Sequence, residues 1–213
     1  MPIHDWTRVP AGLFHDFHQT WTIYLKTALN RGILPKQFQA IVEQDANDAD
    51  SDLPEKQHYA RRANRIAIKH QLRRTVAIVE IVSPGNKASR QAILEFVGRV
   101  NDYLQRGVHV LIVDLFPPSL WDPCGIHKKI WDTFREEQYS LPNGADRILA
   151  SYEAATEIVA YVDPIALGCA LPAMPLFIDK GQYVSVPLEP TYQSTWEACP
   201  GQHAFNRPIF QDE

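Results

Sequence analysis

The sequence has few cysteines, no long apolar run and no excess of positive charge, and each absence excludes a class of protein. Its three cysteines are far apart and form no CxxC pair, which excludes a disulfide framework and a zinc site of that type and favours a reducing compartment. No window approaches the ~20 apolar residues of a membrane span, and no basic segment followed by an apolar one opens the chain. We therefore expect a cytoplasmic protein that does not contact membranes. A formal net charge of −4 argues against a protein that coats nucleic acid through positive charge.

The segment over residues 74–115 is expected to form a strand, a turn, a helix and a second strand. Residues 75–83 ("TVAIVEIVS") and 108–116 ("VHVLIVDLF") are nearly unbroken apolar runs, typical of strands buried on both faces. Between them, a helical repeat of apolar residues stops at Gly107. Such a strand, crossover helix and strand form a right-handed parallel unit. Asp114 would then lie near the carboxyl edge of the sheet, where it either helps to build a site or caps the following loop.

An acidic residue lies in the middle of the first of these strands. Because side chains alternate along a strand, Glu80 shares a face with Ile78 and Val82. An ionised carboxylate in apolar surroundings is costly unless a cation compensates it. Two interpretations stay open: a metal ion binds Glu80, or Lys69, Lys87 or backbone amides hold it as a structural ion pair.

Patterns on either side of this unit predict further helices and strands. They are a helix over 13–30, strands over 38–44 and 65–70, a helix over 125–138, strands over 146–154, 156–168 and 183–188, and a closing helix over 190–199. The short connection at 71–74 predicts an antiparallel hairpin. Pro84 and Gly85 match the centre of a type II turn, where glycine supplies the positive φ. Asn86 or Ser89 is expected to cap the helix that follows.

An acidic stretch and a basic stretch follow each other between residues 43 and 74. The acidic one does not complete a calcium loop, because Leu53 stands where an EF-hand needs glycine, and we expect a solvated loop. In the basic stretch, Arg73 and Arg74 are candidates for contacts with a nucleic-acid backbone. The alternative is a charged strand that resists edge-to-edge aggregation.

Three stretches carry a resemblance to a known family. They are "VAIVEIVSPGNKASRQAI", "GVHVLIVDLFPPS" and "MPLFIDKGQYVSVPLEPTYQSTWEA". Over nearly its whole length the chain resembles the bacterial domain-of-unknown-function family 4058, which has no established activity. The core is also similar to the Uma-type proteins of the PD-(D/E)XK restriction-endonuclease-like superfamily. In those proteins an apolar strand with a glutamate and a Ser-Pro pair precedes a helix and a strand that ends in aspartate.

The superfamily resemblance implies a chemistry for Glu80. Such enzymes hold a divalent cation between an aspartate at a hairpin and a glutamate on the next strand. A lysine two residues after the glutamate helps to activate the attacking water. Glu80 corresponds to the glutamate, but Val82 stands at the lysine position. Lys87 or Lys69 would therefore have to reach the same space.

The resemblance also implies partners for Glu80 in a Mg²⁺ site. Members of family 4058 resemble "EQHxxGxxPDV" in the segment after the first strand, which places Glu43 and Asp52 near the second metal ligand, although the proline of that signature is missing here. The residues expected to contact nucleic acid are Arg73, Arg74 and Asn86.

Together these observations predict an α/β protein with a mixed central sheet in a single domain, residues 1–213. Residues 1–140 would form a restriction-endonuclease-like αβββαβα core, and residues 141–213 a β-rich C-terminal extension with a closing helix. Two functions stay open: a Mg²⁺-dependent phosphodiesterase that acts on nucleic acid, and a non-catalytic binding or assembly protein that keeps the fold without the metal. A third hypothesis is small-anion binding at the helix start near Asn86.

Overall fold

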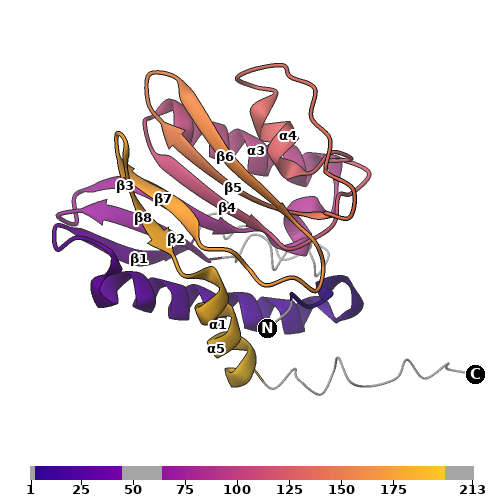
Figure 1. Ribbon diagram of the computed structural model, residues 1–213, viewed down its shortest axis with the longest axis horizontal. Helices are drawn as coiled ribbons and strands as arrows, with labels where there is room; N and C mark the ends of the chain where they lie inside the picture. The colour runs from indigo at the N-terminus through magenta and orange to yellow at the C-terminus, as the bar shows by residue number, and fades with distance from the viewer. Residues whose placement is uncertain (1–2, 45–63, 200–213) are drawn as a thin grey trace, which may run out of the picture.

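The chain folds into a mixed α/β arrangement around one large sheet (Figure 1). A computed structural model describes residues 3–44 and 64–199. Its helices are α1 (Ala11–Ala28), α3 (Arg90–Gln105), α4 (Ile126–Trp131) and α5 (Leu188–Ala198), with short helical turns at Trp6–Arg8, Leu29–Ile33 and Pro84–Lys87. Its strands are β1 (Phe38–Gln44), β2 (Asn64–His70), β3 (Arg74–Ile81), β4 (His109–Asp114), β5 (Arg147–Ala154), β6 (Ile158–Ile165), β7 (Met174–Asp179) and β8 (Gln182–Val186).

The large sheet has six strands in the order β1-β2-β3-β4-β5-β6. Among the described strands, β3 and β4 are the parallel pair, joined by α3 as the crossover, and the other neighbours are antiparallel. The predicted mixed sheet and the predicted β2–β3 hairpin are thus confirmed. The strands β5 and β6, which were expected in a β-rich C-terminal extension, continue the same sheet, because β5 pairs with β4 and β6 pairs with β5. The smaller sheet is the β7–β8 hairpin.

Helices cover both faces of the large sheet (Figure 1). On one face, α1, α5 and the β7–β8 hairpin bury the first core, which includes Phe17, Trp21, Val79 and Tyr192. On the other face, α3 and α4 bury a second core over β4 and β5. Because neighbouring side chains of a strand point to opposite faces, β4 contributes Leu111 and Val113 to the first core and Val110 and Ile112 to the second, as its apolar run predicted. No helix within the described ranges has the length and apolar character that crossing a membrane requires.

Two predicted details of the chain are wrong. Residues Pro84–Lys87 form a helical turn rather than a type II turn, and Gly85 does not have a positive φ, because the side chain of Asn86 closes the turn on Ser83 instead. Helix α4 ends at Trp131, not at residue 138. Residues 135–138 are all charged or polar and offer no apolar face to bury, and the Trp131 ring donates a hydrogen bond to Glu137 where the chain turns back.

Candidate functional site

Glu80 lies on the face of the sheet that α3 covers. It is 6% exposed, in line with the expectation that this strand carries a carboxylate into the core. The Nε atom of Arg99, on α3, lies 3.5 Å from Glu80 Oε1. The guanidinium of Arg99 also packs 5.3 Å from the centre of the Phe96 ring, which holds it above the sheet. A basic side chain therefore approaches Glu80 from the helix.

A second basic side chain lies next to Glu80 within the sheet. Ile66 of β2 pairs with Val79 of β3, so one step further along each strand Arg65 is the neighbour of Glu80. On its other side, Arg65 pairs with Glu43 of β1. Arg65 also points toward α3, since its guanidinium lies 5.6 Å from the Tyr103 ring. Cross-strand neighbours share a face, and Glu43, Arg65 and Glu80 thus form one row across three strands, which we call the charged row.

The two described residues of the predicted metal site each have basic neighbours. Lys69 Nζ lies 2.7 Å from Glu43 Oε1, and Arg65 lies 3.7 Å from Glu43 Oε2. The third predicted ligand, Asp52, lies outside the described residues. Within residues 3–44 and 64–199, no cluster of three or more His, Cys, Asp or Glu side chains is placed to hold a metal ion. A guanidinium between two carboxylates does not fit a divalent cation, because it repels the ion and contributes no oxygen.

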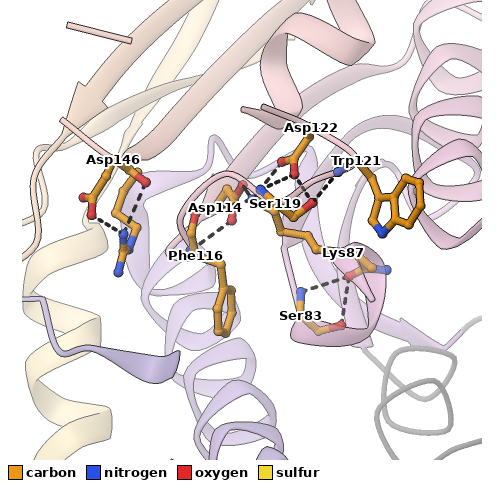
Figure 2. Close-up of polar contacts among 10 residues, drawn as sticks. Ser83, Lys87, Asp114, Phe116, Ser119, Trp121, Asp122 and Asp146 are labelled. Carbon is orange, nitrogen blue, oxygen red and sulfur yellow. Dashed lines mark hydrogen bonds and ion pairs between the residues drawn. The ribbon is translucent and has the colours of Figure 1, made fainter. Parts of the chain in front are cut away.

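Lys87, predicted to act beside Glu80, contacts different acids (Figure 2). Its Nζ atom lies 2.8 Å from Asp114 Oδ2 and 2.9 Å from Asp122 Oδ2. A longer contact of 3.4 Å reaches the carbonyl oxygen of Phe116. The ammonium donates hydrogen bonds to Asp114 Oδ2 and to the Phe116 carbonyl, and it forms an ion pair with Asp122. We call Lys87, Asp114 and Asp122 the lysine cluster.

The lysine cluster is buried and carries two carboxylates for one ammonium. Lys87 is 7% exposed, Asp114 1% and Asp122 0%. Burial by itself lowers the pKa of Lys87, but the charges of Asp114 and Asp122 outweigh it and raise that pKa. Burial raises the pKa of Asp114, and the charge of Lys87 opposes this only in part. The ammonium is therefore firmly protonated, and Asp114 takes up a proton more readily than an ordinary aspartate.

The lysine cluster fastens the loop after β4 to the start of α3. Asp122 Oδ1 accepts hydrogen bonds from the backbone N–H of Ser119, at 2.7 Å, and from its hydroxyl (Figure 2). The backbone N–H of Gly125 donates to the Asp122 carbonyl at 2.7 Å. Gly125 has φ +83°, and a Cβ there would lie 2.3 Å from Ile148 Cδ1, so this turn requires glycine. The loop is held from several sides, and Lys87 provides its link to α3.

Two other predicted residues, Arg73 and Arg74, lie far from Glu80. Both are exposed at the tip of the β2–β3 hairpin. Arg74 opens β3 and Glu80 stands six positions later, which at roughly 3.3 Å per residue separates them by about 20 Å. A single phosphodiester cannot touch both ends of that span. The structure therefore does not bring these arginines and the predicted metal ligand into one site.

Asn86 is the remaining residue predicted to contact nucleic acid. It is 8% exposed, and its Oδ1 atom accepts hydrogen bonds from the N–H and the hydroxyl of Ser83, each at 2.9 Å. Ser89 is the residue that caps α3, through a hydrogen bond from Ala92 N–H. The side-chain oxygen of Asn86 thus serves the turn between β3 and α3.

The sequence patterns did not predict the role of Asp122 or a buried His–Tyr pair. A signal for Asp122 was present in "SLWDP", since an aspartate before proline favours the start of a turn, and Asp122 does begin the turn that the Gly125 N–H closes. In the pair, the Nδ1 atom of His127 lies 2.7 Å from the Tyr152 hydroxyl. Burial lowers the pKa of His127 to about 4, so the ring is neutral near pH 7.

Comparison of the chain with family models, with curated proteins and with solved structures found no match. The resemblances to family 4058 and to the endonuclease-like superfamily therefore stay predictions.

Proposed function

We propose that the chain is a non-catalytic binding or assembly protein, in which arginine side chains rather than a metal ion neutralise the strand carboxylate. The observation that supports this is the position of Arg65 in the charged row, beside Glu80 and opposite Glu43. In the metal-dependent enzymes that the core resembles, an acid on the strand next to the glutamate would complete the metal site. Here a guanidinium stands on that neighbouring strand.

Electrostatics explains why the charged row needs no divalent cation. Arg99 approaches Glu80 from α3, and the strand register places Arg65 next to Glu80 in the sheet. Lys69 and Arg65 both approach Glu43. A buried carboxylate is tolerated when charge-assisted contacts compensate its desolvation. Mg²⁺ would have to displace these cations and find oxygen ligands at about 2.0–2.1 Å. The described residues thus balance the row with their own side chains.

A double-mutant cycle on Glu80 and Arg99 tests the proposal. The single variants Glu80→Gln and Arg99→Gln and their combination are compared with the wild type by urea unfolding in EDTA. We expect a favourable coupling energy of about 0.5–3 kcal/mol, because each single change removes an opposite charge from beside a partly buried one. A cycle on Asp102 and Arg106, an exposed pair on the same helix, is the control, with an expected coupling of about 0.5 kcal/mol or less.

Repeating the urea unfolding with added Mg²⁺ or Mn²⁺ tests whether a metal ion binds at Glu80. If the arginines neutralise Glu80, neither ion shifts the unfolding midpoint of the wild type or of Glu80→Gln, and the coupling energy is the same with and without the ion. A midpoint that rises with Mg²⁺ in the wild type and not in Glu80→Gln would overturn the proposal, because ligand binding to the folded state stabilises it.

A second candidate is the Mg²⁺-dependent phosphodiesterase acting on nucleic acid. The observation that favours it is the shared face of Glu43 and Glu80, with Lys69 at 2.7 Å from Glu43, which supplies two acids and a lysine on one side of the sheet. Asp52 follows β1 in the chain and would complete the ligand set. This candidate requires cleavage of DNA or RNA that depends on Mg²⁺ and is lost in Glu80→Gln while the variant keeps its fold.

A further inference from the structure

The strand β6 forms one end of the six-stranded sheet and leaves one row of backbone groups without a strand partner in the described part of the chain. On its other side, β6 pairs with β5, from Arg147↔Ile165 to Ala154↔Ile158. In an antiparallel pair, the N–H and C=O groups of alternate residues point toward the neighbour or away from it. The β5–β6 register therefore shows which residues of β6 direct their N–H and C=O groups toward β5 and which direct them to the free side.

Two contacts establish which residues of β6 point outward. The N–H of Ala154, on β5, donates to His109 Nδ1 on β4, so even-numbered residues of β5 point away from β6 and odd-numbered ones toward it. In the β5–β6 register, Ser151 pairs with Tyr161, and the odd-numbered residues of β6 therefore bond β5. Pro164, which has no N–H, belongs to the even-numbered set. The free edge thus consists of the backbone groups of Ile158, Ala160 and Val162.

The side chains of β6 lack the features that usually block an edge. Natural edge strands carry lysines, bulges or central prolines that prevent pairing with another chain. β6 reads "IVAYVDPI" and contains no lysine or arginine, and its proline stands near the end. Val159 and Tyr161 are 42% and 46% exposed on the face opposite α3 and α4. An open, apolar, regular edge of this kind is a template for another strand.

We propose that β6 pairs antiparallel with β6 of a second copy of this chain, with the two-fold axis at Ala160. In this register Ala160 is opposite the partner's Ala160, and Ile158 is opposite the partner's Val162. Three hydrogen-bonded residue pairs then exchange about six backbone hydrogen bonds. The same surface is used by both copies, which closes the assembly at a dimer.

The register also pairs the exposed side chains favourably. Tyr161 lies opposite the partner's Val159, and the symmetry repeats this pair, so four partly exposed apolar side chains are covered. Aromatic and β-branched residues form favourable cross-strand pairs. In contrast, Asp163 comes next to the partner's Glu157, and these like charges weaken the dimer. Because this register brings two acids together, reversing one of the two charges tests it.

Substitutions on the free edge test the dimer without touching the β5–β6 ladder. Ala160→Pro removes an N–H that points away from β5, as native Pro164 already does, and we expect it to weaken dimerisation at least about tenfold. Val159→Lys introduces a charge opposite the partner's Tyr161 and should have the same effect. Leu94→Lys, at a 54% exposed position on α3, is the matched control and should leave the dimer unchanged. Sedimentation equilibrium over a concentration series measures each dissociation constant.

Reversal of one charge tests the register. Glu157→Lys places an amine next to the partner's Asp163 at both ends of the interface, and we expect dimerisation about fivefold tighter. A wild type that stays monomeric over the series, an Ala160→Pro variant that is folded and still dimeric, or a Glu157→Lys variant no tighter than wild type would each overturn the proposal. β6 and the charged row lie toward opposite ends of the sheet, so these outcomes are independent of the proposed function.

Discussion

Substitution of Lys87 by methionine is expected to lower the free energy of unfolding by about 3–5 kcal/mol, the cost of removing one partner from a buried ion cluster. The ammonium is held by Asp114, Asp122 and the Phe116 carbonyl. Methionine keeps much of the volume but leaves two carboxylates buried without their cation. The loop after β4 also loses its link to α3, so its amide protons should exchange faster.

The loss of unfolding free energy caused by Lys87→Met should become smaller both below and above neutral pH. Without the ammonium, the pKa of Asp114, already raised by burial, rises further. As the pH falls through that raised pKa, the folded variant takes up a proton before the unfolded chain does, so the penalty becomes smaller. In the wild type, the contribution of Lys87 is lost as the pH rises through its raised pKa, above the ordinary 10.5. The difference between the two proteins is therefore largest near neutral pH.

Urea unfolding at a series of pH values measures this difference. The exposed Lys129 on α4 supplies the control, and Lys129→Met should change the free energy of unfolding by less than about 0.5 kcal/mol. The triple variant Lys87→Met, Asp114→Asn, Asp122→Asn should be more stable than Lys87→Met alone, because it removes the buried charge. A Lys87→Met penalty that is small, or the same at every pH, would show that the lysine cluster is not a buried ion network.

Replacement of Trp21 by alanine is expected to destabilise the protein by about 3–5 kcal/mol. Trp21 is fully buried between α1 and α5, and its ring N–H donates to Thr191 Oγ1 at 3.0 Å. Its ring also meets the Tyr192 ring edge to face at 5.3 Å between centres. The variant leaves a large cavity and removes a hydrogen bond and a ring contact between α1 and α5, so α5 should detach more readily from α1.

Limited proteolysis and thermal unfolding check the Trp21→Ala result. Cleavage should begin near α5, at a lower temperature than in the wild type, because this helix depends on α1 for its buried face. Ile23, on the same helix, is 50% exposed, and Ile23→Ala should change stability by about 0.5 kcal/mol or less. Equal effects of the two substitutions would contradict the contact that the structure gives Trp21.

Several features of the site were predictable from residues close together in the chain. The apolar runs around Glu80 and Asp114 predicted buried strands, and the periodic helix between them predicted a parallel unit. The burial of Glu80 followed from its place in such a run. The identity of its cation did not follow, because Lys69 and Lys87 were equally plausible in sequence and neither is the basic residue in the charged row next to it.

Local patterns of polarity thus determined the types of helices α1, α3, α4 and α5 and of the described strands other than β7. They also determined the parallel β3–α3–β4 unit and the burial of Glu80, since alternation and helical periodicity act over a few residues. Tertiary structure alone decided that Arg65 stands beside Glu80, that Lys87 meets Asp114 and Asp122, and that β6 ends the sheet. These outcomes depend on strand register and on the packing of segments far apart in the chain. One step of register turns every side chain of a strand to the other face, and short-range patterns carry no information about that step.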